Sequence, residues 1–189
     1  MANKDPFARV ENIFSKKDYL KWSEAILKAV EKWIARQDTK DGNLLPLVNL
    51  GNLNEINNVI FDALSNTNYS EEIKKFNLLF PDISTMIQED QQFYNQIKLR
   101  DDYFNLYEKT YQNQTISKLA GDEFSGTYIQ KIKNEVIKSF TSGGSVEDLS
   151  TTLFDLIITS GDVTLLENYS QVITRDLLYQ YEGLFLTIS

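Results

Sequence analysis

A chain of 189 residues, of which 42% are hydrophobic and 12% aromatic, has enough apolar surface to bury a substantial core. The sequence contains no Cys and no His, which excludes disulfides, thiolate nucleophiles, Ser-His-Asp triads and the common zinc sites. A formal net charge of −8 opposes contact with DNA and anionic lipid, and no apolar run approaches the roughly 20 residues of a membrane helix. We therefore expect a protein that is not an enzyme, carries no cofactor or metal, and binds neither membrane nor specific nucleic acid.

The N-terminal segment predicts one amphipathic helix followed by an extended connector. Ser15 can cap the helix together with Asp18, and an apolar stripe at three- and four-residue steps follows as far as Trp33. The helix should end near Arg36. Residues 44–48 are apolar but interrupted by Pro, which indicates an extended connector that packs on the core.

Two shorter helices are predicted next. Asn52 or Asn54 can cap the first of them, and the turn-rich segment 65–68 should end it. The second begins after Ser70. Pro81 must kink it or make it restart, because Pro lacks the amide hydrogen that a helix interior needs.

The restarted helix is predicted to be the long one. Apolar residues keep helical spacing from Ile83 to Tyr111, which predicts one rod-like helix and a contact between subunits of an oligomer. An aromatic stripe of this kind is typical of a core, although exposed members would make good interface anchors. The candidate interaction residues on this stripe are Tyr94, Phe104, Tyr107 and Tyr111.

The C-terminal third predicts three helices. Gly121–Gly126 should interrupt the chain, with Ser125 capping the helix that follows. A turn is expected at residues 141–144. Ser145 and Asp148 then resemble a capping box at the start of a further helix.

The last helix should cover about residues 165–185. Arg175 and Asp176 lie inside it, and Gln180 is found one turn later. A guanidinium near a carboxylate can lock helices together through paired hydrogen bonds. We interpret Arg175, Asp176 and Gln180 as a polar patch for helix packing or for docking a partner.

These elements predict an all-α fold, an irregular bundle of six or seven helices with one long helix. Three segments are expected. Residues 1–50 would hold the N-terminal helix and connector, residues 51–120 a helical arm with the long helix, and residues 121–189 a helical domain.

Charged clusters offer an alternative, a carboxylate-dependent hydrolase or metal enzyme. Sequence neighbours on a helix point in different directions, so adjacent carboxylates build no site by themselves, and we interpret them as solvated surface. The same holds for the basic residues Lys131, Lys133 and Lys138, which Glu135 dilutes. The carboxylate pairs are Glu71-Glu72, Glu89-Asp90, Asp101-Asp102, Asp122-Glu123 and Glu147-Asp148.

Three stretches near the C-terminus form a combination with a family resemblance. They are Ile132–Lys138, the Thr-Ser-Gly-Gly-Ser junction at 141–145 with Leu149 and Leu153 behind it, and Gln171–Tyr181. Together they resemble a segment of the minor head proteins of tailed bacteriophages, also called head-morphogenesis or Mu F-like proteins. The resemblance covers about residues 128–189, and residues 43–80 are similar to the helical N-terminal part of that family more loosely.

The resemblance implies a structural protein of the virion. Such a protein would be made in the host cytoplasm and would lie at the portal vertex or in the head interior, acting in head assembly or genome delivery. Its partners would be the portal or other head proteins, and it could form a homo-oligomer that matches the portal symmetry. The alternatives are a phage neck or adaptor protein and a cellular helical module for protein–protein interaction.

One departure from the family concerns the region after the last helix. Members usually continue into a smaller mixed domain with a Cys-containing motif, whereas this sequence stops at Ser189. We expect either a naturally short version or the helical part alone. A function housed in that further domain is not assigned to this sequence.

Overall fold

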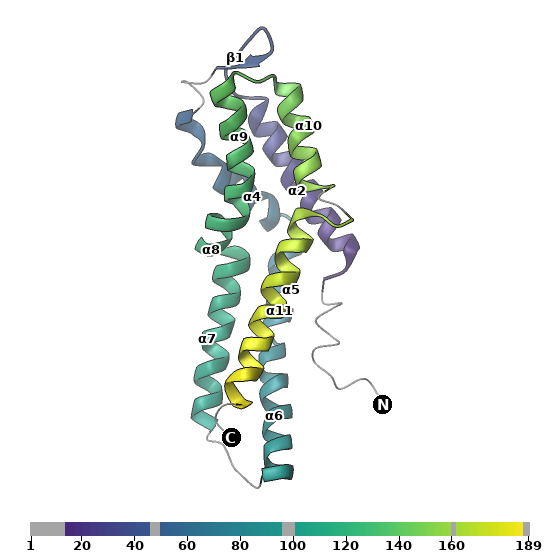
Figure 1. The fold of residues 1–189 in the computed structure, drawn as a ribbon, viewed down its shortest axis with the longest axis vertical. Helices are drawn as coiled ribbons and strands as arrows, with labels where there is room; N and C mark the ends of the chain where they lie inside the picture. Colours follow the sequence, from purple (N-terminus) through teal and green to yellow (C-terminus); the bar gives the residue numbers. More distant parts are fainter. Residues whose placement is uncertain (1–13, 46–49, 96–100, 160–161, 187–189) are drawn as a thin grey trace.

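The computed structural model describes residues 14–45, 50–95, 101–159 and 162–186, which form an elongated helical bundle (Figure 1). The first part of the chain forms α2 (Lys16–Ile34), β1 (Thr39–Lys40), β2 (Asn43–Leu44), the 3₁₀ turn η1 (Leu50–Asn52), α4 (Glu55–Ser65), α5 (Tyr69–Asn77) and α6 (Leu79–Asn95). The second part forms α7 (Asp101–Ala120), α8 (Asp122–Phe124), the π-helical turn η2 (Ser125–Ile129), α9 (Gln130–Ser142), α10 (Val146–Ile157) and α11 (Leu165–Leu186). The all-α class is confirmed.

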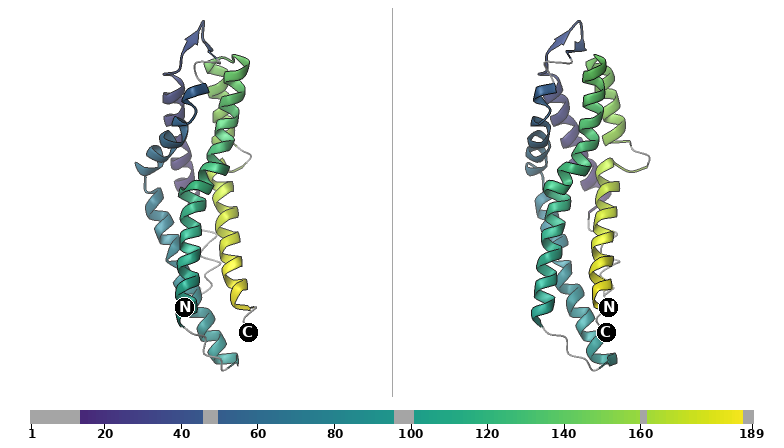
Figure 2. Two further views of the ribbon diagram at one scale, coloured as in Figure 1. Left: turned by 90° about the vertical axis from the view of Figure 1, so that its left-hand side faces the viewer. Right: turned by 60° about the vertical axis from the view of Figure 1, so that its left-hand side comes forward.

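The chain makes four passes along the long axis of the bundle. In Figures 1 and 2 it rises through α2, descends through α4, α5 and α6, rises through α7, α8 and α9, and descends through α10 and α11. The upper half of the view packs α2, α4, α9 and α10 together, and the lower half packs α5, α6, α7 and α11. Buried side chains from all three expected segments, 1–50, 51–120 and 121–189, join one hydrophobic core.

The predicted first helix is confirmed. The Ser15 side chain accepts a hydrogen bond from the Asp18 amide at 3.1 Å, and α2 ends at Ile34, close to the expected Arg36. Its apolar stripe is buried throughout, and Trp22 and Trp33 are among the largest fully buried side chains. Burial of this face against α4, α10 and α11 stabilises α2 far more than helix propensity does.

A short hairpin follows α2 where only an extended connector was predicted. Asp41 and Gly42 both have positive φ, 54° and 80°, so the turn twists in the sense that suits paired strands. Thr39 pairs with Leu44 across it. The rest of the predicted connector, residues 46–48, lies outside the described residues.

The hairpin is fastened to the turn between α9 and α10. The Leu44 amide donates to the Gly144 carbonyl at 3.0 Å, and the Val146 amide donates to the Gly42 carbonyl at 3.2 Å. Gly143 ends α9 in the left-handed conformation, with φ of 64°, which an L side chain adopts only with strain. The Ser145 side chain then caps α10 by accepting from the Asp148 amide at 3.0 Å, as the sequence predicted.

The predictions for α4, α5 and α6 hold in outline. Asn54 occupies the cap position of α4 but makes no capping hydrogen bond with its side chain, and α4 ends at Ser65 as expected. The chain restarts at Leu79 after α5. Pro81 lies in the first turn of α6, where its missing amide hydrogen costs no helical hydrogen bond.

The prediction of one rod over Ile83–Tyr111 is wrong. These residues belong to α6 and α7, which pack side by side and run in opposite directions (Figures 1 and 2). Residues 96–100 between them lie outside the described residues, and their sequence contains neither Gly nor Pro to signal a break. Because α6 and α7 each bury an apolar face in the same core, the helical spacing of apolar residues continues from one to the other. That spacing alone therefore predicts a single helix.

A long helix is present, but it lies later in the chain, from Phe104 to residue 142. It runs through α7, α8, η2 and α9 as the teal-to-green column of Figure 1. Ser125, predicted to cap a new helix, lies inside this column, and its hydroxyl donates to the Gly121 carbonyl. Within this column the helical backbone is interrupted at Gly121, whose φ and ψ are −124° and −148°. An added Cβ at Gly121 would lie 2.9 Å from the Ser117 Cα, so only Gly fits there.

The two helix-capping residues, Ser15 and Ser145, and the non-capping Ser125 give a direct test of these helix boundaries. Ser15→Ala and Ser145→Ala should each lower the free energy of unfolding by about 1 kcal/mol, because each leaves a helix-end amide without its acceptor. Ser125→Ala should cost less than about 0.5 kcal/mol, since Ser125 caps no helix. Urea denaturation followed by circular dichroism measures all three, and equal losses at Ser125 and Ser15 would contradict the position of Ser125 inside the column.

Candidate functional site

The aromatic residues predicted as interface anchors are core residues wherever their side chains are described. Phe104 and Tyr111 are buried, and Tyr107 is half-buried. The Tyr111 ring contacts the rings of Phe80 and Tyr181, with distances between ring centroids of 5.9 and 5.1 Å. Tyr94 belongs to α6, but its side chain lies outside the described residues. Tyr111 therefore helps to hold α6, α7 and α11 together, and the members of the stripe whose side chains are described lie in or against the core.

The predicted polar patch has a different position. Arg175, Asp176 and Gln180 are all exposed on α11, and the residues between them, Leu177 and Leu178, are buried. Within the described part of the chain no ion pair involves Arg175 or Asp176. The patch therefore does not lock helices together inside the bundle, which leaves partner docking as its predicted role.

Sequence reasoning missed an aromatic cluster at mid-length, where the upper and lower halves of the bundle meet. Successive ring contacts cross from α2 through α5, α8 and η2 to α11, with centroid distances between 4.7 and 6.4 Å. We call this set the aromatic junction. Its members are Tyr19, Trp22, Tyr69, Phe124, Tyr128 and Tyr169.

The aromatic junction also completes the hydrogen bonding of α7. The Tyr69 hydroxyl donates to the Leu119 carbonyl at 2.8 Å, and the Tyr169 hydroxyl donates to the Lys118 carbonyl at 2.6 Å. Carbonyls in the last turn of a helix lack their usual amide partners, and buried ones need another donor. Two phenols brought from distant parts of the chain supply those donors next to Gly121.

Burial changes the acid–base behaviour of the junction. Loss of solvation raises the pKa of Tyr19, Tyr69 and Tyr128 well above the ordinary value of 10.0. The buried carboxylate of Glu167 adds to the rise in the pKa of Tyr19. These phenols therefore stay protonated at neutral pH, and the Tyr69 hydroxyl can donate its hydrogen bond to the Leu119 carbonyl.

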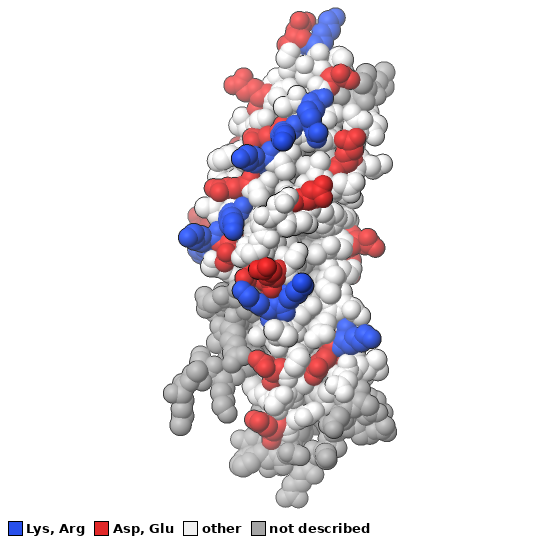
Figure 3. Space-filling model, turned by 180° about the vertical axis from the view of Figure 1, so that it is seen from behind, with Lys and Arg blue, Asp and Glu red and all other residues white. Residues whose placement is uncertain are grey.

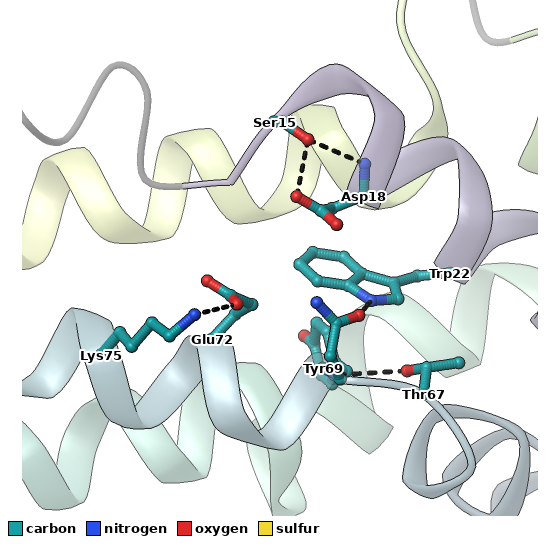
Figure 4. A network of polar contacts seen from close by, with 8 residues as sticks. Ser15, Asp18, Trp22, Thr67, Tyr69, Glu72 and Lys75 are labelled. Carbon is teal, nitrogen blue, oxygen red and sulfur yellow. Dashed lines mark hydrogen bonds and ion pairs between the residues drawn. The ribbon is translucent and has the colours of Figure 1, made fainter.

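A second set of contacts joins the start of α2 to the start of α5 (Figure 4). The Trp22 indole N–H donates to Asn68 Oδ1 at 3.0 Å, and the Tyr69 amide donates to Thr67 Oγ1 at 3.1 Å. The Ser15 hydroxyl donates to Asp18 Oδ2 and lowers the pKa of that carboxyl below 3.8. The stabilising contribution of Asp18 is therefore present above that pH and is lost as the pH falls below it.

The outer surface of α9 and α10 carries a shallow hollow of about 420 Å³. Its lining includes Lys131, Lys138 and Leu156, and Lys138 is paired with Glu135 at 2.6 Å. Figure 3 shows the back of the bundle, where acidic side chains lie beside the basic ones. The ion pair between Lys138 and Glu135 agrees with the prediction that Glu135 offsets the positive charge of the neighbouring lysines. We assign the hollow no ligand.

Among residues 14–45, 50–95, 101–159 and 162–186, no group of three or more acidic side chains is placed to hold a metal ion. No helix among them is both long enough and apolar enough to cross a membrane.

The fold by itself defines a class, an elongated all-α bundle of four passes joined at mid-length by aromatic rings. No family model, no curated protein and no solved structure matches the chain. The resemblance to minor head proteins therefore depends on the quoted residues alone and stays a prediction.

Two tyrosines of the junction should respond differently to loss of the hydroxyl. Tyr69→Phe should lower the free energy of unfolding by about 1–3 kcal/mol, because the buried Leu119 carbonyl loses its donor. Tyr128→Phe should be neutral or stabilising, since within the described residues the Tyr128 hydroxyl has no hydrogen-bond partner. Urea denaturation of both variants measures the difference, and an equal loss in the two would show that the Tyr128 hydroxyl is bonded.

Alkaline pH should unfold the bundle through the same residues. Since folding raises the pKa of Tyr19, Tyr69 and Tyr128, their contribution to stability is complete below pH 10 and is lost as the pH rises beyond it. We expect tyrosinate absorbance of these rings to appear together with loss of the helical circular dichroism signal. The urea-unfolded chain is the control. Titration of all ten tyrosines near pH 10 with the helix signal intact would contradict this assignment.

Proposed function

We propose that this chain is a structural protein of a tailed-phage virion, a minor head component at the portal vertex or in the head interior. The observation that carries the proposal is the residue combination Ile132–Lys138, 141–145 and Gln171–Tyr181, which resembles the minor head proteins. The proposed role is head assembly or genome delivery through contacts with the portal or other head proteins. It requires no cofactor and no catalytic turnover.

The positions of the three stretches are consistent with a shared structural role. The first lies on α9, the second forms the turn that binds the β1–β2 hairpin, and the third covers the exposed and buried sides of α11. Leu149 and Leu153 of α10 are buried between these elements. The residues that resemble the minor head proteins thus include both buried core positions and exposed surface positions. This mixture suits a protein that acts by binding other proteins.

The surface also suits a protein partner. Five exposed apolar side chains lie on α7, α10 and α11, where they could pack against another protein. They are Leu106, Ile116, Phe154, Val172 and Tyr179. An acidic overall charge would keep a head-interior protein from adhering to packaged DNA.

The protein inventory of purified particles tests this proposal. Mass spectrometry of nuclease-treated, gradient-purified particles of the phage that encodes the chain should detect it at far lower copy number than the major capsid protein. A phage replication protein abundant in the same lysate should be absent and is the control. A chain abundant in the lysate yet missing from the particles would overturn the proposal.

Heads without tails separate the head position from the neck. Particles blocked in neck assembly should still contain the chain, and the purified chain should co-migrate with the portal protein in size-exclusion chromatography. Presence only in particles with a completed neck would favour a neck or adaptor protein instead.

A further inference from the structure

The turn of the β1–β2 hairpin carries a chemically reactive pair of residues. Asp41-Gly42 is the only place in the sequence where Asp or Asn precedes Gly. Because Gly has no side chain to crowd its amide nitrogen, this nitrogen can approach the carboxyl carbon of the preceding Asp. The product of that attack is a five-membered cyclic imide. Both residues are exposed, in the hairpin at the top of the view in Figure 1.

The side chain of Asp41 is free to react. Within the described part of the chain, no hydrogen bond or ion pair engages the Asp41 carboxylate. The space beside the attacking residue is also open, since a Cβ built on Gly42 would meet no atom within 4 Å. No neighbouring group therefore holds the carboxylate away from the Gly42 nitrogen.

The turn itself favours this reactive pair. Asp41 and Gly42 both have positive φ, 54° and 80°, which Asp and Gly adopt more readily than most residues. A bulkier residue in place of Gly42 would slow the attack, but it would strain the turn. The residues that suit the hairpin are thus the same residues that can cyclise.

Two backbone hydrogen bonds hold the hairpin on the turn between α9 and α10. The Val146 amide donates to the Gly42 carbonyl at 3.2 Å, and the Leu44 amide donates to the Gly144 carbonyl at 3.0 Å. We call these two bonds the hairpin clasp. Val146 is the first residue of α10, so its amide has no acceptor within the helix and depends on the clasp.

The hairpin clasp controls access to the reactive conformation. Ring closure brings the Gly42 nitrogen onto the Asp41 side chain and changes the backbone angles of Asp41, which the folded turn fixes. The clasp opposes this movement because it holds the Gly42 carbonyl in place. β1 and β2 have only two residues each, so opening of the hairpin costs far less than global unfolding. The reaction can therefore proceed from an opened hairpin while the bundle stays folded.

We propose that Asp41 is a site of spontaneous conversion to isoaspartate, at a rate set by opening of the hairpin clasp. The Gly42 nitrogen forms a bond to the side-chain carboxyl carbon of Asp41, and the carboxyl OH leaves with the amide hydrogen as water. Water then opens the cyclic imide. Cleavage of the bond from nitrogen to the side-chain carbon restores Asp, whereas cleavage of the bond to the main-chain carbon gives isoaspartate. The mass of the chain is unchanged.

Conversion of Asp41 releases the hairpin clasp. The main chain of isoaspartate runs through the side-chain carbons, which lengthens the turn by one backbone atom. The lengthened turn no longer fits the pairing of Lys40 with Asn43, and it moves the Gly42 carbonyl away from the Val146 amide. The hairpin then loses its attachment to the start of α10. The proposal does not depend on a role in a virion.

Peptide mapping of the folded chain after prolonged incubation at neutral pH tests the chemistry. Electron-transfer fragmentation distinguishes isoaspartate from Asp, and we expect isoaspartate at residue 41 and at no other Asp. In water enriched in heavy oxygen, each isoaspartate should carry at least one heavy oxygen atom, because solvent water opens the imide. The control is Asp41→Glu, whose longer side chain would need a six-membered ring and should give no isomer.

The chain unfolded in guanidinium chloride supplies the reference rate. It should convert faster than the folded chain, because no hairpin restrains Asp41. A folded chain that shows no isoaspartate after the unfolded chain has converted would overturn the proposal. Equal rates in the folded and unfolded chains would equally overturn control by the hairpin clasp.

Val146→Pro tests that control directly. Pro is favoured at the first position of a helix, and Ser145 before it already has the extended backbone that precedes Pro, with φ of −72° and ψ of 153°. The variant lacks the amide that donates to Gly42. It should raise the rate of isoaspartate formation about fivefold, the factor by which loss of one net hydrogen bond of about 1 kcal/mol raises the open fraction.

Two variants are the controls for Val146→Pro. Lys16→Pro places Pro at the same position of α2, away from the hairpin, and should leave the rate unchanged. Val146→Ala keeps the amide and shortens the side chain, so it should raise the rate less than Val146→Pro does. A wild-type rate in Val146→Pro, or equal increases in Val146→Ala and Val146→Pro, would show that the clasp does not set the rate.

Hydrogen exchange tests the structural consequence. Chromatography separates the isoaspartate form from the unmodified chain, and both are then exposed to heavy water. The Leu44 and Val146 amides should exchange faster in the isoaspartate form, because the hairpin clasp is their protection. Amides of α11 should exchange at the same rate in both forms and are the control. Equal exchange of the Val146 amide in the two forms would contradict release of the clasp.

Discussion

The interruption of the long helix at Gly121 is the constraint on which the rest of the structure depends. It leaves the carbonyls of Lys118 and Leu119 without their usual helical partners, and the Tyr169 and Tyr69 hydroxyls bind them instead. Those two tyrosines belong to α11 and α5, so the hydrogen bonding of one helix end requires two other passes of the chain to be in place. The rings that deliver the hydroxyls form the aromatic junction. The upper and lower halves of the bundle are therefore coupled through one local irregularity.

Much of the local structure could be predicted because its cause is local. Ser15 and Ser145 cap helices through atoms three residues away, and Gly143 ends a helix through its own φ. The Asp41-Gly42 turn also carried a signal, since Asp-Gly is the strongest short hairpin pattern, but its two flanking strands are too short to show an alternating pattern. Signals of this kind depend on a few neighbouring residues and on nothing else in the fold.

The errors came from features that only the assembled bundle determines. Helical spacing from Ile83 to Tyr111 is the same whether the chain forms one rod or a hairpin, because both arms face one core. For the same reason the aromatic stripe could not be divided into core and surface from sequence, and Phe104 and Tyr111 proved to be buried. The exposure of Arg175 and Asp176 could be seen only once the packing of Leu177 and Leu178 was known. The aromatic junction was missed because its members are far apart in sequence.

The four-pass path sets the order in which the bundle can be completed during synthesis. When α10 has left the ribosome, the lower half consists of α5, α6 and α7 alone, and the groove that will receive Leu177, Leu178 and Tyr181 is still open to water. The Tyr169 hydroxyl, which donates a hydrogen bond to the Lys118 carbonyl, is added only with α11. Until its last helix emerges, the nascent chain therefore exposes to water the aromatic side chains that Leu177, Leu178 and Tyr181 cover in the complete bundle.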